Sequence, residues 1–99
     1  MSVGPIEMNY GDTLRKAERL ETISSELRYK ANQMEQAADA DTRDWQGDAS
    51  EEFDRKAHQL AGIARSHADK LAMTAEALRR AAERYHRLEE MGNFIFGSH

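Results

Sequence analysis

The sequence contains few of the residues that interrupt or cross-link a chain. It has no cysteine, one proline (Pro5) and six glycines among its 99 residues. Without cysteine, disulfides, thiol nucleophiles and cysteine-based metal sites are excluded. The glycines lie mostly near the two ends and in the middle of the chain. Two long stretches are therefore almost free of helix breakers, which favours long helices.

Long apolar segments are also missing. Hydrophobic residues make up 39% of the chain and charged residues 32%, and no apolar run approaches the roughly 18 residues that a membrane span needs. The first ten residues, MSVGPIEMNY, have neither the basic start nor the apolar stretch of a secretory signal. We expect one soluble domain over residues 1–99, with a thin core, no stable membrane insertion and no cleaved signal peptide.

The second half of the chain carries the more regular pattern. From Phe53 to Leu88, apolar positions alternate in steps of four and three, a repeat of about 3.5 residues that is typical of a coiled-coil-like helix. Asp48 and Glu51 resemble a capping box at its start, and Gly92 with Asn93 is a typical helix stop. The pattern predicts a helix over about 48–91 and a tail over 92–99.

The first half repeats the pattern less strictly and predicts a helix over about 12–41. The connection of about six residues, 42–47, is so short that the two helices must be antiparallel neighbours. Gly47 provides a position without a Cβ where the chain reverses, and Trp45 provides a large apolar group that could close the end of the hairpin. The predicted fold is all-α, an antiparallel helical hairpin.

Large apolar residues mark a seam along both predicted helices. We expect this seam to hold the hairpin together and to continue into a dimer interface, because two helices cannot bury two such long stripes completely in each other. A second hairpin would complete a four-helix bundle. The seam consists of Leu20, Leu27, Met34, Phe53, Leu60, Leu71 and Leu78.

Charge is divided unevenly between the halves. Residues 1–54 hold 13 acidic and 6 basic residues, net −7, and residues 55–99 hold 5 acidic and 8 basic residues, net +3, which gives the total of −4. The acidic residues gather around the bend, and arginines gather towards the end of the second helix. In one hairpin these two groups would be roughly 50 Å apart, far beyond the ~8 Å screening length. An antiparallel dimer would bring these opposite charges together.

With Trp45-Gln46-Gly47 at a central bend between two heptad-patterned helices, the chain resembles the WXG family of small bacterial proteins. This family of about a hundred residues per chain is related to the early secreted antigenic target of mycobacteria. The resemblance extends from about Ile6 to about Asn93. It implies a substrate or co-substrate of a type VII (ESX-like) secretion system, made in the bacterial cytoplasm and secreted as a folded homodimer, or as a heterodimer with a paralogous WXG protein.

A second match concerns the end of the second helix. Members of this family, or one member of a heterodimeric pair, carry Tyr-X-X-X-Asp/Glu there as part of the secretion signal, and Tyr85-His-Arg-Leu-Glu89 fits that pattern. The resemblance implies that Tyr85 and Glu89 contact the secretion ATPase. From the residues alone, Tyr85 is equally the next heptad position and Glu89 a solvated charge.

Two other functions share these features. The chain could be an accessory chaperone or targeting partner that binds the N-terminal helical domain of a larger secreted toxin. It could also be an intracellular coiled-coil adaptor, which predicts that it stays in the cell fraction.

Catalytic and cofactor chemistry finds no support in the sequence. There is no phosphate-binding glycine loop and no nucleophile motif, so we expect no enzyme activity and no cofactor. His58 with Asp54, and His86 with Glu90, share helix faces but offer only two ligands each, so we expect no metal site. His67 lies on the heptad pattern and is interpreted as a packed histidine. The arginines at 79–87 are interleaved with Glu83 and flanked by Glu76, Glu89 and Glu90 on a chain of net charge −4, so they offer no basic stripe for nucleic acid.

Overall fold

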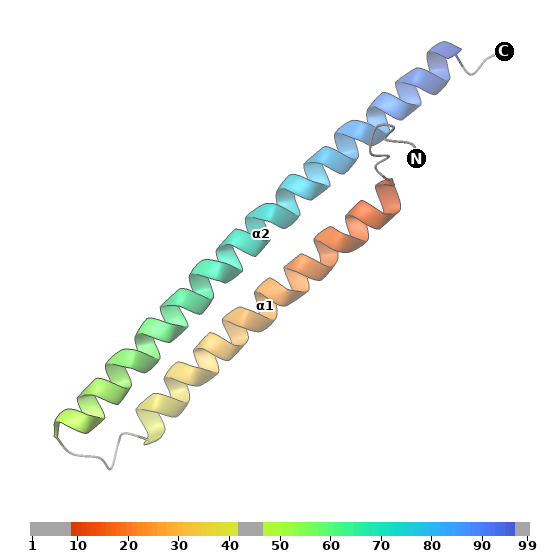
Figure 1. Ribbon diagram of the computed structural model, residues 1–99. Coiled ribbons are helices and arrows are strands. Elements are labelled where there is room, and N and C mark those ends of the chain that lie inside the picture. The colour runs from red at the N-terminus through yellow and green to blue at the C-terminus, as the bar shows by residue number, and fades with distance from the viewer. Residues whose placement is uncertain (1–8, 42–46, 97–99) are drawn as a thin grey trace, which may run out of the picture.

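The computed structural model describes residues 9–41 and 47–96, with side chains over 9–40 and 47–92. Helix α1 (Tyr10–Asp41) and helix α2 (Asp48–Phe96) lie side by side and antiparallel (Figure 1). Their lengths of 32 and 49 residues correspond to roughly 48 and 73 Å. The molecule is accordingly a rod of 79 × 26 × 14 Å. The predicted all-α hairpin is confirmed.

Helix α1 begins two residues before the predicted start at Asp12, because Asn9 caps it. The Asn9 side-chain Oδ1 accepts a hydrogen bond from the backbone N–H of Asp12 at 2.9 Å. The Asn9 carbonyl accepts from the N–H of Thr13, also at 2.9 Å. These bonds satisfy backbone donors that have no partner within the first turn.

Helix α2 begins at Asp48 as predicted but continues to Phe96, beyond the expected end at Met91. Among the described residues, the glycine with positive φ is Gly47, at 88°, and its carbonyl accepts from the N–H of Glu51 at 3.4 Å. Gly92 keeps a helical conformation. A glycine ends a helix when it adopts the left-handed conformation, and otherwise it only weakens the helix by about 1 kcal/mol.

The interface between the helices is lined by small side chains. Fully buried positions recur every seven residues on each helix, and none of the described large side chains is fully buried. Alanine at the contact line allows two helix axes to approach closely. The buried apolar positions are Ala17, Ala31, Ala38, Ala57, Ala61, Ala68, Ala75 and Ala82, and the buried polar ones are Thr13 and Ser24. We call this set the alanine seam.

One hydrogen bond crosses the middle of the alanine seam. Ser24 Oγ donates to the backbone carbonyl of Ala68 at 2.7 Å. The bond satisfies a hydroxyl that would otherwise be buried without a partner. It also ties one α1 residue to one α2 residue, so it specifies how far the helices slide along each other.

The large apolar residues that we expected at the seam lie on one flank of it. Leu20, Leu27, Leu71 and Leu78 are half-buried, whereas Met34, Phe53 and Leu60 are exposed. The large apolar residues and the alanines both recur at intervals of seven residues, and the alanines lie on the line where the two helices meet. His67, interpreted from the sequence as packed, is exposed in this hairpin.

The opposite flank is held by polar contacts between the helices. Arg79 binds Glu21 with two hydrogen bonds, of 3.0 Å from Nε and 2.7 Å from Nη2. Arg65 donates to Asn32 Oδ1 at 2.7 Å and also to Glu35, and Arg28 pairs with Asp69. Ion pairs this exposed add little stability each. Together they identify the charged face of the hairpin.

Candidate functional site

The bend supplies the first candidate motif. Gly47 has the left-handed backbone that a residue with a side chain adopts only at a cost, and a Cβ added there would meet nothing within 4 Å. The special role predicted for Gly47 is thus one of backbone conformation. Trp45 lies outside the described residues.

The second candidate motif lies where α2 passes the start of α1. The Tyr10 hydroxyl donates to Glu83 Oε1 at 2.8 Å, and its ring stacks on His86 with centroids 4.3 Å apart and planes 16° apart. Tyr85 is half-buried beside this contact, and Glu89 is exposed one turn further along. From there α2 continues beyond the first turn of α1 (Figure 1). The two residues of the motif therefore lie at the boundary between the paired and the extended parts of α2.

The apolar flank forms an open face with two shallow grooves. Near the bend, a groove of about 260 Å³ is lined by Met34, Ala37, Phe53 and Leu60, among others. Towards the other end, one of about 330 Å³ is lined by Leu20, Ile23 and Leu78 with the stems of two basic residues. Phe53 is 39% and Leu60 55% exposed. We call this surface the apolar face.

Part of the charge at the arginine-rich end of α2 is already paired within the hairpin. Arg79 binds Glu21, and Arg80 pairs with Glu76 on its own helix. Arg84 and Arg87 make no ion pair with any other side chain in the described part of the molecule. They are two of the cations at this end that could meet an acidic partner.

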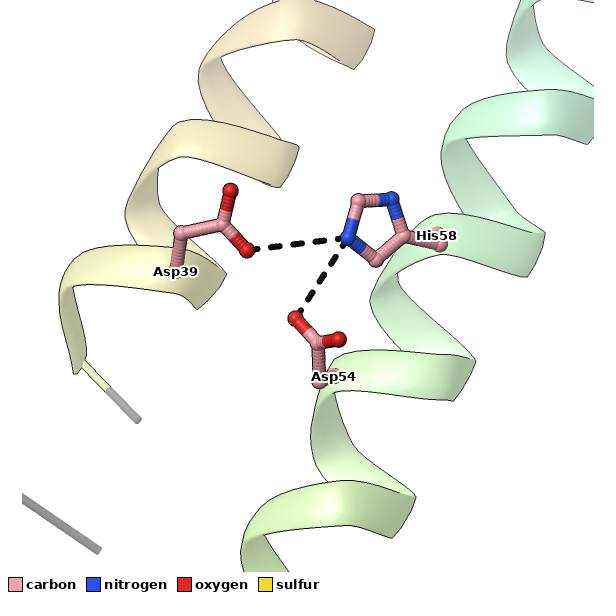
Figure 2. A group of neighbouring side chains, drawn as sticks. All are labelled: Asp39, Asp54 and His58. Carbon is pink, nitrogen blue, oxygen red and sulfur yellow. Dashed lines mark ion pairs between the residues drawn. The ribbon is translucent and has the colours of Figure 1, made fainter. Parts of the chain in front are cut away.

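Close to the bend, His58 lies among three carboxylates. Its Nδ1 contacts Glu35 Oε2 at 2.6 Å, and its Nε2 lies 3.6 Å from Asp39 Oδ1 and 3.4 Å from Asp54 Oδ1. Figure 2 shows Asp39 on α1 pointing across to Asp54 and His58 on α2. The three ligand-type atoms of Asp39, Asp54 and His58 lie within 4.8 Å of one another. In the described part of the chain, this is the group whose donors could hold a metal ion.

The contacts around Glu35 shift two titrations. Hydrogen bonds from Arg65 first, and then from His58, lower the pKa of Glu35 from 4.5 to about 2. The hydrogen bond to Glu35 raises the pKa of His58 above 6.5, and the charges of Asp54, Glu35 and Asp39 act in the same direction. Elsewhere the hydrogen bond from Arg79 lowers the pKa of Glu21. None of these groups is fully buried, although Glu35 is only 22% exposed, so they adjust local charge rather than dominate stability.

Only half of the His58 group is visible in the sequence. The pair His58 and Asp54 was visible because the two residues are four apart on one helix. Asp39 and Glu35 belong to the other helix, and only the register of the hairpin brings them to His58. A sequence signal was present, since Glu35 and Asp39 are also four residues apart, but nothing in that spacing selects their partner.

Helices α1 and α2, over their described residues, contain no stretch with the length and apolarity of a membrane span. Comparison with known families finds a match over residues 5–90 to the family model WXG100, described as proteins of 100 residues with WXG. No curated protein and no solved structure matches the chain significantly.

Proposed function

Because the chain belongs to the WXG100 family, whose members are small secreted helical proteins and known type VII secretion substrates, we propose that it is exported by such a system as a folded dimer. The observation that carries this proposal is the open apolar face. Proteins of this family generally form dimers, and this face has the character of an interface that lacks its partner.

The imbalance between buried and exposed apolar groups supports a dimer. The described core consists of eight alanines, whose methyl groups contribute on the order of 0.8 kcal/mol each. Large side chains of the apolar face, such as Ile23, Phe53 and Leu60, remain at least 37% exposed. Covering them with a second hairpin would remove their apolar surface from water and form a four-helix bundle.

Charge favours an antiparallel arrangement of the two hairpins. Arg84 and Arg87 would lie near the acidic bend of the partner, where Asp48 and Glu51 occupy the first turn of α2. Opposite charges at matching ends orient the encounter and disfavour the parallel alternative. The partner is a second copy of the chain or a paralogous WXG protein.

The export signal in this proposal is the pair Tyr85 and Glu89, with the Trp45-Gln46-Gly47 bend. Four residues apart on α2, Tyr85 and Glu89 share one helix face. They lie where α2 leaves the contact with Tyr10, so a large partner such as the secretion ATPase can approach them from the free end. An aromatic ring next to a carboxylate offers that partner one apolar and one charged contact.

The dimer is tested by placing a charge on the apolar face. Leu60→Glu should convert the dimer to a monomer in light scattering coupled to gel filtration, because the dimer would bury that carboxylate without a counter-ion. Met73→Glu is the matched control, since Met73 is 71% exposed on the same helix and lines neither groove. A wild-type chain that is monomeric at micromolar concentration, alone and with its neighbouring gene products, refutes the dimer.

The signal is tested in a secretion assay in the producing bacterium. Tyr85→Ala should abolish export while helicity and dimerisation persist, and Glu89→Ala should reduce it. Tyr29→Ala removes another tyrosine, one that is 63% exposed on α1, and should be exported normally. Normal export of the Tyr85→Ala protein refutes the signal assignment.

The same open face also fits the alternative function, that of an accessory partner for the N-terminal helical domain of a larger exported toxin. In that case the purified chain alone should remain monomeric, and it should form a tight complex with an adjacently encoded helical protein. An intracellular adaptor is distinguished by its complete retention in the cell fraction.

A further inference from the structure

The described side chains include one group that export and dimerisation do not use, the cluster of His58, Asp39 and Asp54 near the bend. It lies on the charged face, away from the apolar face. We propose that these three residues bind one divalent transition-metal ion, Zn²⁺ or Co²⁺, and that Glu35 orients the histidine. The proposal is independent of the function proposed above.

Distances within the cluster separate an orienting contact from ligand positions. Glu35 Oε2 lies 2.6 Å from His58 Nδ1, which is a hydrogen bond. On the other side of the ring, Nε2 lies 3.4 Å from Asp54 and 3.6 Å from Asp39. These separations are too long for N–H···O hydrogen bonds. They are close to the roughly 3.3–3.5 Å between neighbouring ligands of a tetrahedral zinc ion with bonds of about 2.0–2.1 Å, and Asp39 needs to move only slightly closer.

Nδ1 of His58 makes the kind of hydrogen bond that orients a metal-bound histidine. Histidine ligands in zinc sites usually donate their other N–H to a carboxylate, which selects the tautomer and raises the basicity of the ligand nitrogen. Here Glu35 accepts from Nδ1, leaving Nε2 directed between the two aspartates (Figure 2). The contact comes from α1, so the packing of the hairpin prepares the ligand.

One shielded oxygen of the cluster has no hydrogen bond among the described residues, and its charged neighbour is His58 Nε2 at 3.4 Å. Asp54 Oδ1 is shielded from solvent and accepts no hydrogen bond, although the side chain as a whole is 41% exposed. A shielded carboxylate oxygen without a donor costs free energy, and a cation bound there would remove that cost.

Charge and donor type select the class of ion. Glu35 is neutralised by Arg65, which leaves Asp39 and Asp54 with a combined charge of −2 facing the imidazole. One nitrogen and two carboxylate oxygens, with water as the fourth ligand, suit Zn²⁺ or Co²⁺. Mg²⁺ and Ca²⁺ prefer six or more oxygen ligands. The bound ion would join α1 to α2 near the bend.

The experiment is a titration of the chelator-stripped, full-length chain with ZnCl₂ by isothermal calorimetry, and with CoCl₂ by visible absorption. We expect one ion per chain, a higher melting temperature with zinc, and no comparable effect of MgCl₂ or CaCl₂. His58→Ala and Asp54→Asn should lose the calorimetric signal. Glu35→Ala should weaken binding by roughly 10–100-fold, as loss of an orienting partner does.

His86→Ala is the matched control, because His86 and Glu90 repeat the four-residue spacing at 3.8 Å without a carboxylate from α1. This variant should bind zinc like the wild type. Circular dichroism establishes that each variant is helical, and Asp39→Asn, at a largely exposed side chain, tests the site should His58→Ala unfold. The absence of saturable zinc binding, or binding that survives both His58→Ala and Asp39→Asn, overturns the proposal.

Discussion

Replacing Ala75 by leucine should destabilise the hairpin markedly. Ala75 is fully buried on the alanine seam, where α1 passes directly opposite. Leucine adds three carbon atoms, and gains of roughly 0.8 kcal/mol per methylene are realised only where there is room for them. On a contact line made of methyl groups, the helices must move apart instead. Overpacking of this kind costs about 1–3 kcal/mol.

The assay is thermal unfolding followed by circular dichroism at one fixed protein concentration, because a dimer's melting temperature depends on concentration. For a domain of this size, a loss of 1–3 kcal/mol lowers the melting temperature by roughly 4–24 °C. Ala77→Leu is the control. Ala77 lies two residues away on the same helix and is exposed, so both variants have the same change in helix propensity and only Ala75→Leu meets α1.

Equal melting temperatures for the two variants would refute the reasoning. That result would mean that the helices meet along another line, such as the leucine stripe through Leu71 and Leu78. In that case Leu71→Ala should destabilise the isolated hairpin more than Ala75→Leu does.

Three further predictions concern the bend, acid and salt. Gly47→Ala should lower the free energy of unfolding by about 1–2 kcal/mol in urea, because alanine resists a φ of 88°. Gly62→Ala is the control: in open helical surroundings, it should raise the free energy of unfolding by about 1 kcal/mol. Equal effects of the two substitutions would contradict the role of Gly47 at the bend. Because the folded hairpin lowers the pKa of Glu21 and of Glu35, the latter from 4.5 to about 2, the stability that these carboxylates supply is complete above pH 4.5 and lost as the pH falls towards 2. The urea midpoint, measured with a chelator present, should therefore fall as the pH is lowered from 4.5 towards 2, and it should fall less steeply in Glu21→Gln. A urea midpoint independent of pH would contradict this role of the two carboxylates. The affinity of the proposed dimer should weaken as salt rises from roughly 50 to 300 mM, because salt screens the opposite charges. The double variant Arg84→Ala, Arg87→Ala should flatten that dependence in sedimentation experiments.

The sequence alone determined the two helices, their antiparallel pairing and the role of Gly47. Each rests on local physical chemistry: a heptad pattern free of breakers, a short connection, and a residue without a Cβ. It also carried the Trp45-Gln46-Gly47 motif by which the family is recognised. The ends of the helices were less determined, because Asn9 caps α1 through its side chain and Gly92 keeps a helical backbone.

Tertiary structure decided which stripe of each helix faces the other. Alanines and leucines both recur every seven residues on adjacent stripes of the same helix, and periodicity gives the spacing of a stripe without giving its direction. Packing places the methyl groups between the helices, where the backbones can approach, and leaves the leucines, Phe53 and Met34 on an open face. The same register brings Asp39 and Glu35 to His58, since residues on different helices become neighbours only when the helices are aligned along their length.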